Sequence, residues 1–418
     1  MEEKKNIPEI RFKGFEGEWE ENIFGSTFTY LTSNTLSRAE LNYKTGTYKN
    51  VHYGDVLIKF GELLDIRNDQ IPFITHDKVA EKINSSILQN GDVVIADTAE
   101  DESVGKCTEL INIKHEKAVA GLHTIPVRPI GSFASKYLGY YMNSPSFHNQ
   151  LIQLMQGIKV LSVSKSSIRN TTIKYPAEKK EQSQIGSFFK DLDKQITLEQ
   201  QKHDKLVTLK KAMLEKMFPK EGEDVPEIRF KGFEEKWEER KLGEISNTYS
   251  GGTPSVGNSE FYNGNIPFIR SAEINCNSTE LSITELGLKS SSAKMVNTGC
   301  ILYALYGATS GEVGRSKLEG AINQAILAIM PYNEFDSEFI MQWLRKKKKV
   351  IVNTYLQGGQ GNLSGSIVKN LNIDLPNFNE QTKIGSYFQN LDKLISLQQK
   401  KIDKLKNIKK ACLEKMFV

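Results

Sequence analysis

The chain has 418 residues, of which 39% are hydrophobic and 25% charged, with a formal net charge of +4 at pH 7. This length predicts about two to four globular domains, and the small net charge allows DNA binding through local patches without predicting it. No apolar run approaches the ~20 residues that span a bilayer, the N-terminus has no apolar signal region, and the four cysteines form no CxxC pair. We therefore expect a cytoplasmic protein without a membrane segment, a disulfide framework or a metal site.

A short lead-in segment opens the chain and returns in its second half. Residues 8–25 (PEIRFKGFEGEWEENIFG) and 226–243 (PEIRFKGFEEKWEERKLG) are identical at 13 of 18 positions. Internal repeats of this kind govern the architecture of a chain, so they constrain every later interpretation.

The region that follows the first lead-in, residues 26–175, is predicted to mix strands and helices. The apolar runs at 91–97 (GDVVIAD) and 123–127 (HTIPV) predict strands, whereas residues 136–142 and 147–156 predict helices.

Two long helices are predicted from a second repeat. Residues 181–218 and 380–417 are identical at 24 of 38 positions, and their apolar residues recur at alternating steps of four and three, the a/d pattern of a coiled-coil seam. Glu199 and Gln398 each interrupt this pattern with one polar position. The seam positions are Ile185, Phe189, Leu192, Ile196, His203, Leu206, Met213 and Met217 in the first helix, and Ile384, Phe388, Leu391, Ile395, Ile402, Leu405, Cys412 and Met416 in the second. Pairing of the helices with each other is favoured over the alternative, in which each packs only on its own domain.

The order of the repeats predicts how the helices pair. If a pseudo-twofold axis relates the halves, the helices run antiparallel, and the two intervening regions lie at opposite ends of a rod of ~54 Å. The same symmetry brings Val418 near Met1, so that residues 1–19 correspond to 219–237.

The second intervening region, residues 244–375, shows little sequence similarity to the first. Residues 265–270, 299–305 and 325–331 predict strands and 337–353 a helix, whereas the Gly- and Ser-rich stretches 250–259, 307–314 and 357–366 predict loops. Both regions end in a similar polar loop, apolar segment and proline, so we interpret them as divergent versions of one fold. The expected division is 1–180, 181–218, 219–379 and 380–418.

Signatures of catalysis are missing from the sequence. There is no P-loop, GxGxxG, HExxH, GxSxG elbow or amino-methyltransferase tetrapeptide. We interpret the acidic cluster Asp97, Glu100, Asp101 and Glu102 as a solvated loop, and His203 as a packed seam residue rather than a metal ligand.

The chain resembles the specificity (S) subunits of type I restriction-modification enzymes over essentially its whole length. The resemblance rests on the duplicated EQxxIGxxFxxLDxxI…KKAxLEKMF helix, the RFKGFExxWE lead-in and the SGGTPS…YNGNIPFI…ITELGL…NQAILAI string of the second region. The first region lacks both SGGTP and NQA.

The resemblance implies a mixed α+β chain with two target recognition domains separated by two long antiparallel coiled-coil helices. Each domain would read one half of an asymmetric, bipartite DNA site, and the helices would set the spacer. Two methyltransferase (M) and two restriction (R) subunits would be the partners. The chain itself would be non-catalytic, because S-adenosylmethionine, ATP and Mg would belong to those partners.

Polar loops are the expected source of contacts to base edges and phosphates. The candidate DNA-binding residues are Lys159, Ser162, Ser164 and Lys165 in the first region, and Thr253, Ser255, Arg270, Arg315, Gln357, Gln360 and Asn362 in the second. The basic run 345–349 is expected to be either a phosphate contact or a solvated face. Two alternatives remain open from sequence: a coiled-coil scaffold that does not bind DNA, and an enzyme with an unrecognised site.

Overall fold

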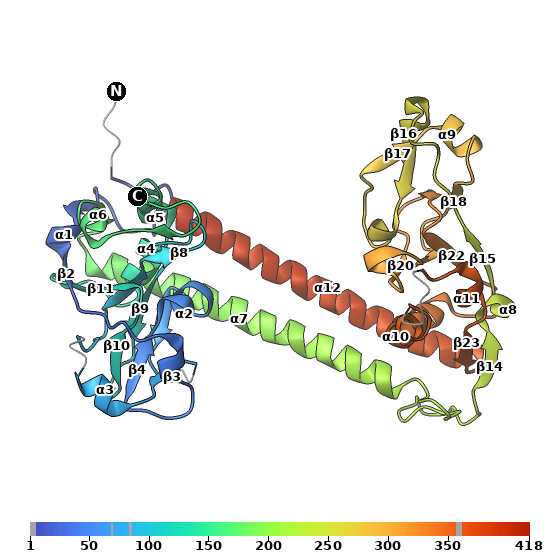
Figure 1. Cartoon of the computed structure of the whole chain (residues 1–418), viewed down its shortest axis with the longest axis horizontal. Coiled ribbons are helices and arrows are strands. Elements are labelled where there is room, and N and C mark those ends of the chain that lie inside the picture. Colours follow the sequence, from blue (N-terminus) through green and yellow to red (C-terminus); the bar gives the residue numbers. More distant parts are fainter. Residues whose placement is uncertain (1–5, 68–69, 83–85, 357–361) are drawn as a thin grey trace. The chain divides into compact units, whose positions relative to one another are not determined.

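The computed structural model describes residues 6–67, 70–82, 86–356 and 362–418 and divides into two compact units (Figure 1). Unit 1 comprises Met1–Gln200 and Lys400–Val418, and unit 2 comprises Gln201–Gln399. The boundaries fall inside two long helices, α7 (Lys179–Lys216) and α12 (Phe378–Lys415), so each unit contains part of both.

Unit 1 is built around two sheets. The central sheet has the strand order β2-β11-β7-β9-β5 and the second sheet β10-β4-β6-β3. Its elements are β1 (Glu20–Ile23), α1 (Phe24–Thr27), β2 (Phe28–Tyr30), η1 (Arg38–Glu40), β3 (Leu41–Asn42), β4 (Tyr48–Val51), α2 (Tyr53–Ile58), β5 (Leu63–Asp65), β6 (Phe73–Ile74), α3 (Asp77–Lys82), β7 (Val93–Ala96), β8 (Thr98–Ala99), β9 (Cys107–Ile111), β10 (Lys117–Ala120), β11 (Thr124–Pro129), α4 (Tyr137–Met142), α5 (Pro145–Ile152), β12 (Leu161–Ser162), α6 (Lys165–Arg169) and β13 (Thr172–Tyr175).

Unit 2 is also built around two larger sheets, ordered β15-β22-β19-β20 and β17-β16-β21-β18. Its elements are β14 (Glu238–Lys241), α8 (Leu242–Ile245), β15 (Ser246–Ser250), η2 (Ser259–Phe261), β16 (Tyr262–Ile269), η3 (Ser271–Glu273), β17 (Leu281–Ile283), α9 (Glu285–Lys289), β18 (Lys294–Val296), β19 (Ile301–Ala304), η4 (Gly307–Thr309), β20 (Val313–Arg315), β21 (Gly320–Ile322), β22 (Ile326–Pro331), α10 (Ser337–Leu356), α11 (Gly365–Lys369) and β23 (Asn372–Leu375).

The two units share a topology despite their dissimilar sequences. In their order across the sheet, the strands β2-β11-β7-β9 correspond to β15-β22-β19-β20. The parallel pair β10–β4 corresponds to β21–β16, and the antiparallel pair β1–β13 to β14–β23. This confirms the prediction that both regions are divergent versions of one mixed α+β fold. The loop predicted at 307–314 is wrong in part, because Val313 begins β20.

Continuous apolar runs form the inner strands of both central sheets. The four residues of β7 (VVIA) and the four of β19 (ILYA) are all buried. A short run of this kind, bounded by glycine, is typical of a strand that is covered on both faces.

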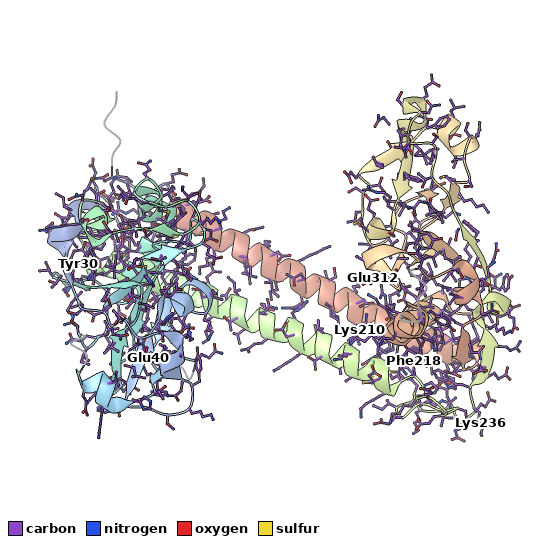
Figure 2. All side chains as sticks on the ribbon, in the orientation of Figure 1. Tyr30, Glu40, Lys210, Phe218, Lys236 and Glu312 are labelled. Carbon is purple, nitrogen blue, oxygen red and sulfur yellow. The ribbon has the colours of Figure 1, made fainter. Side chains whose placement is uncertain are left out.

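The long helices run antiparallel within each unit. In unit 1 the rings of Phe189 and Phe417 stack at 5.6 Å, and Lys401 Nζ lies 2.9 Å from Glu199 Oε1. In unit 2 the C-terminal part of α7 meets the N-terminal part of α12: the rings of Phe218 and Phe388 lie 6.0 Å apart (Phe218 is labelled in Figure 2). An early residue of one helix therefore meets a late residue of the other, as the symmetry argument predicts.

The predicted seam positions differ in how deeply they are buried. The buried ones are Ile185, Phe189, Leu192, Met217, Ile384, Phe388, Leu391, Ile402 and Met416, and the half-buried ones are Ile196, His203, Leu206, Met213, Ile395, Leu405 and Cys412. The seam is also continuous with the domain cores, since Ile185 and Phe189 share a cluster with Trp19 and Tyr137. At their ends the helices therefore pack on a domain core and on each other, since Phe417 belongs to the same cluster, and the alternative of packing only on a domain is wrong.

Equivalent contacts join each lead-in to the end of a long helix. Ile10 N donates to Lys415 O at 2.9 Å, and Ile228 N donates to Lys216 O at 2.9 Å. The aromatic pairs repeat as well, with Trp19 on Phe417 and Trp237 on Phe218. These contacts confirm that the first lead-in packs against the end of α12 in the same way as the second lead-in packs against the end of α7.

Candidate nucleic-acid interface

Most of the described candidate residues lie around the same end of the central sheet in each unit, whereas Arg315 lies at the other end, because it faces Ile301 at the start of β19. In unit 1, Val163 N donates to Asp97 O at 2.9 Å and Asp97 N to His123 O at 3.1 Å. In unit 2, the corresponding bonds run from Leu363 N to Leu305 O at 3.1 Å and from Leu305 N to Ala325 O at 2.8 Å. We call the loops that meet here, after β7 or β19, before β11 or β22, and before α6 or α11, the sheet-end loops.

A tight hairpin presents Lys159 in unit 1. Gln156 and Ser162 exchange two backbone hydrogen bonds of 3.0 and 2.9 Å. Gly157 has a φ of 125°, and a Cβ there would lie 1.9 Å from Val160 O, so the turn requires glycine. The hairpin leaves Ile158 fully exposed (100%) and Lys159 exposed.

Ser164 and Lys165 start the short helix α6. The Ser164 hydroxyl accepts a hydrogen bond from Ser167 N at 3.0 Å, so this side chain has an N-cap role in the fold. Lys165 O accepts from the Tyr30 hydroxyl at 3.0 Å, which leaves the exposed Lys165 side chain extending from an anchored backbone. Ser162 is also exposed, on β12.

In unit 2 the structure brings together two parts of the sequence string that carries the family resemblance. The Thr253 hydroxyl of SGGTP donates to Gln324 Oε1 of NQA at 2.6 Å. A Cβ on Gly251 would lie 1.8 Å from Ile322 O, so only glycine permits this approach. Ser255 lies exposed in the same loop. Gln324 was missed as a candidate residue, although its place inside the NQA string could have indicated it.

The two candidate arginines of unit 2 already have carboxylate partners. Arg270 Nε donates to Glu273 Oε2 at 3.1 Å and its Nη2 to Glu280, and these hydrogen bonds raise the pKa of Arg270. Arg315 donates to Gly299 O at 2.8 Å and to Glu338 Oε2 at 3.0 Å. Any contact of either guanidinium with DNA would therefore compete with bonds inside the domain.

The remaining candidates lie around α11 and in α10. Asn362 is exposed next to the buried Leu363, whereas Gln357 and Gln360 lie outside the described residues. The basic run 345–349 is not a fully solvated face, because three of its members have partners within unit 2, while a phosphate contact stays a prediction: Arg345 pairs with Asp392 at 2.9 Å, Lys346 donates to Phe218 O at 3.2 Å, and Lys348 pairs with Glu312. These side chains hold α10 in place.

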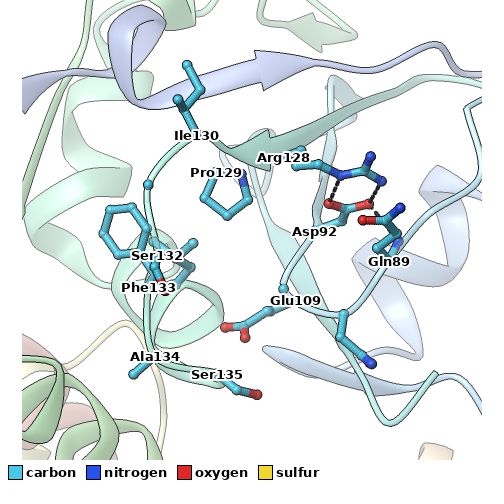
Figure 3. Close-up of a pocket in the computed structure, with 14 residues that line it drawn as sticks. Gln89, Asp92, Glu109, Arg128, Pro129, Ile130, Ser132, Phe133, Ala134 and Ser135 are labelled. Carbon is cyan, nitrogen blue, oxygen red and sulfur yellow. Dashed lines mark hydrogen bonds and ion pairs between the residues drawn. The ribbon is translucent and has the colours of Figure 1, made fainter. Parts of the chain in front are cut away.

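The charged side chains that line a cavity of unit 1, Arg128, Asp92 and Glu109, form hydrogen bonds with other residues of the unit. The cavity has a volume of about 340 Å³, and Arg128 donates two hydrogen bonds to Asp92 at its rim, of 2.8 and 2.7 Å (Figure 3). Burial raises the pKa of Glu109 to about 7, and its carboxylate accepts from Lys136 N at 2.5 Å and Gly139 N at 2.9 Å. The cavity therefore offers a ligand no unsatisfied charge.

The acidic loop of unit 1 is held by local hydrogen bonds. Asp97 Oδ1 lies 3.3 Å from His123 Nδ1, and Asp101 accepts from Ser103 N at 2.9 Å. Over residues 6–67, 70–82, 86–356 and 362–418, no three His, Cys, Asp or Glu side chains are grouped so that they could hold a metal ion. In the same residues no helix is both long and apolar enough to cross a membrane.

A family model identifies the two units. The model for the type I restriction modification DNA specificity domain matches residues 16–208 and again residues 234–407. The chain belongs to this family. Each match covers the second half of one lead-in, one sheet-rich region and most of one long helix.

Characterised relatives are similar over part of their length. The chain is 28% identical over 176 residues to the type I restriction enzyme EcoR124I/EcoR124II specificity subunit of Escherichia coli, covering 40% of this chain and 43% of that one. It is 27% identical over 190 residues to the MjaIX specificity subunit of Methanocaldococcus jannaschii, covering 44% of each chain. These alignments thus span less than half of either relative.

Solved structures share the fold over nearly the whole chain. The S subunit of a type I restriction-modification system from M. genitalium superposes with a TM-score of 0.63 at 14% identity, covering 99% of both chains. A chain from a study of complex assembly and conformational transition in a type I R-M system gives 0.57 at 18% identity, covering 94% of this chain and 96% of that one.

Proposed function

We propose that this chain is the non-catalytic DNA-specificity subunit of a type I restriction-modification complex. The observation that carries the proposal is the double match to one DNA specificity domain, on a duplicated frame whose sheet-end loops differ in chemistry. Unit 1 presents the exposed Lys159 on a hairpin and Lys165 at the start of α6, whereas unit 2 presents hydroxyl and amide groups in its SGGTP and NQA loops. Each set would read one half of an asymmetric bipartite site.

The partners follow from the same proposal. Two methyltransferase subunits would dock on the frame and two restriction subunits would complete the complex, with S-adenosylmethionine, ATP and Mg bound by those partners. The paired helices α7 and α12 would set the spacer, so deleting seven residues from each should change the spacer and leave both half-sites intact. Such a complex would act on DNA in the cytoplasm.

Sequencing of methylated bases tests the proposal in cells that co-express this chain with its methyltransferase subunit. A gapped, asymmetric motif with N6-methyladenine on both strands, lost when this chain is omitted, is the expected result. Assembly of the complex without any new methylated motif would contradict it and would favour a scaffold that does not bind DNA.

A further inference from the structure

A compact group of charged side chains in unit 1 surrounds the carboxylate of Asp55. Arg38 Nη1 donates to Asp55 Oδ2 at 2.7 Å, and Lys59 Nζ lies 3.2 Å from Oδ1. Both cations also contact the Tyr43 hydroxyl, Arg38 at 3.2 Å and Lys59 at 2.6 Å. Two cations around one carboxylate leave a net positive charge at this place.

The arrangement exposes the cations and hides the anion. The Arg38 side chain is 45% exposed and the Lys59 side chain 41%, whereas that of Asp55 is only 1% exposed. A ligand that approaches from solvent therefore meets positive charge.

One edge of the Arg38 guanidinium remains open. Nη1 makes the contacts to Asp55 and Tyr43, while the one other contact found among the described residues runs from Nη2 to His52 Nδ1 at a long 3.4 Å. Nε and Nη2 can thus donate two parallel hydrogen bonds, the geometry in which arginine binds phosphate. Because Asp55 already fixes the guanidinium, binding would cost less side-chain entropy than at a free surface arginine.

Ring contacts connect this group to the sheet-end loops. The rings of His52 and Tyr53 lie 4.7 Å apart, and those of Tyr53 and His123 lie 5.2 Å apart. His123 contacts Asp97, whose carbonyl receives Val163 N next to the hairpin. The group around Arg38 is therefore contiguous with the surface that presents Lys159.

We propose that Arg38, supported by Lys59, binds a backbone phosphate of DNA beside the half-site that unit 1 reads. The inference rests on the proposed function and adds to it a positioning contact that carries no base information. It is specific to unit 1, since the loop after β15 in unit 2 (SGGTPSVGN) has no lysine or arginine.

The test measures the affinity of the full-length chain, co-expressed with its methyltransferase subunit, for two fluorescein-labelled duplexes of unrelated sequence, as a function of salt. Loss of one phosphate contact makes the slope of log K against log salt shallower by about 0.9. We expect Arg38→Gln to show this change and to bind both duplexes about tenfold more weakly at low salt.

Arg67→Gln is the matched control. Arg67 also pairs with an aspartate, Asp65, at 2.8 Å, but Asp65 aligns with Ile111 at the end of β9, which runs antiparallel to β7. Arg67 therefore lies at the other end of the central sheet from Asp97, and its loss should leave the salt slope unchanged.

The outcomes separate the inference from the proposed function. A wild-type complex with no salt-dependent binding would contradict the proposed function itself. Normal wild-type binding with an unchanged slope in Arg38→Gln would overturn only the phosphate contact, as would a loss limited to one duplex, which would indicate base reading. If Arg38→Gln disturbs folding, Lys59→Gln decides, because it keeps the Arg38–Asp55 pair: a shallower slope supports the inference and an unchanged slope overturns it.

Discussion

Glu109 in unit 1 and Arg315 in unit 2 occupy the same place in the two central sheets and carry opposite charges. Glu109 faces Val93 of β7, and Arg315 faces Ile301 of β19, the corresponding strand. Glu109 accepts hydrogen bonds from backbone N–H groups at the start of α4, whereas Arg315 donates to Glu338 and Ser337 at the start of α10. Both side chains thus tie the sheet to the helix that follows it.

A second equivalence lies on the long helices themselves. Asp193 of α7 receives the Tyr140 hydroxyl at 2.7 Å and pairs with Lys409 at 2.7 Å. Asp392 of α12 receives the Gln342 amide at 3.1 Å and pairs with Lys210. The Asp–Lys pair is the same on the long helices of both units. The residue that donates to the aspartate from the sheet-rich region differs, Tyr140 in unit 1 and Gln342 in unit 2. The two units are therefore free to diverge at their sheet-end loops.

The largest expected effect comes from the ion pairs that connect each lead-in to the first turn of a long helix, which are the same in both units. Arg11 pairs with Glu181, which is 2% exposed, through two bonds of 2.8 Å, and Arg229 pairs in the same way with Glu380, which is fully buried. Removing one partner of a buried pair leaves an uncompensated charge, so Arg11→Ala and Arg229→Ala should each destabilise their unit by about 3 kcal/mol. Hydrogen-exchange mass spectrometry, which resolves the units, measures the loss. A large loss of stability for one variant alone would show that the two ion pairs do not have the same role in their units.

Arg315→Ala should destabilise unit 2 by roughly 2 kcal/mol. The substitution leaves the Glu338 carboxylate, which is 9% exposed, without its cation, although Gln342 still donates to it. Arg240→Ala is the control, because Arg240 and its partner Glu238 are both largely exposed and the pair should contribute less. Equal protection from exchange in Arg315→Ala and the native chain would show that this arginine does not hold α10.

Glu109→Gln should change how the stability of unit 1 depends on pH. The folded pKa of about 7 lies above the ordinary value of 4.5, so the folded state binds more protons between these values and loses stability as pH rises through this range. Glutamine removes the charge, but its NH2 group cannot accept the N–H bond that one of the two carboxylate oxygens accepts, so Glu109→Gln should be less stable than the native chain near pH ~5 by about 1 kcal/mol. Between pH ~5 and pH ~7.5 the native chain should lose about 2 kcal/mol relative to the variant. Melting curves at the two pH values measure this change, and a difference between variant and native chain that is the same at both pH values would contradict the raised pKa.

Lys159→Ala should have the smallest effect on folding. Its side chain is exposed on the hairpin, so the change in unfolding free energy should stay within about 0.5 kcal/mol. DNA affinity should nevertheless fall, since a cation of the sheet-end loops is lost. Binding curves for Lys159→Ala and for Lys236→Ala, an exposed lysine outside these loops, compare the two sites. Equal affinity in both variants would remove the hairpin from the interface.

The sequence predicts the frame well and the interface only in outline. The heptad pattern is local and both repeats align without a gap, so the antiparallel helices and the equivalent backbone contacts of Ile10 and Ile228 follow from the residues alone. The correspondence of Glu109 with Arg315 does not, because it depends on strand register between regions without alignable sequence. From the sequence we expect Arg270 and Arg315 to be loop residues that could contact DNA. Their carboxylate partners are not foreseen, because the pairing depends on the fold and the partner of Arg315 lies 23 residues away in the chain.

The central claim is that one frame carries two independent DNA-reading units. Sequencing of methylated bases in cells that express the methyltransferase subunit with a double variant, Thr253→Ala and Gln324→Ala, tests it most directly. The account predicts that one half of the gapped motif changes or becomes degenerate while the other half and the spacer stay as in the native chain. Simultaneous change in both halves, with the complex assembled, would contradict it.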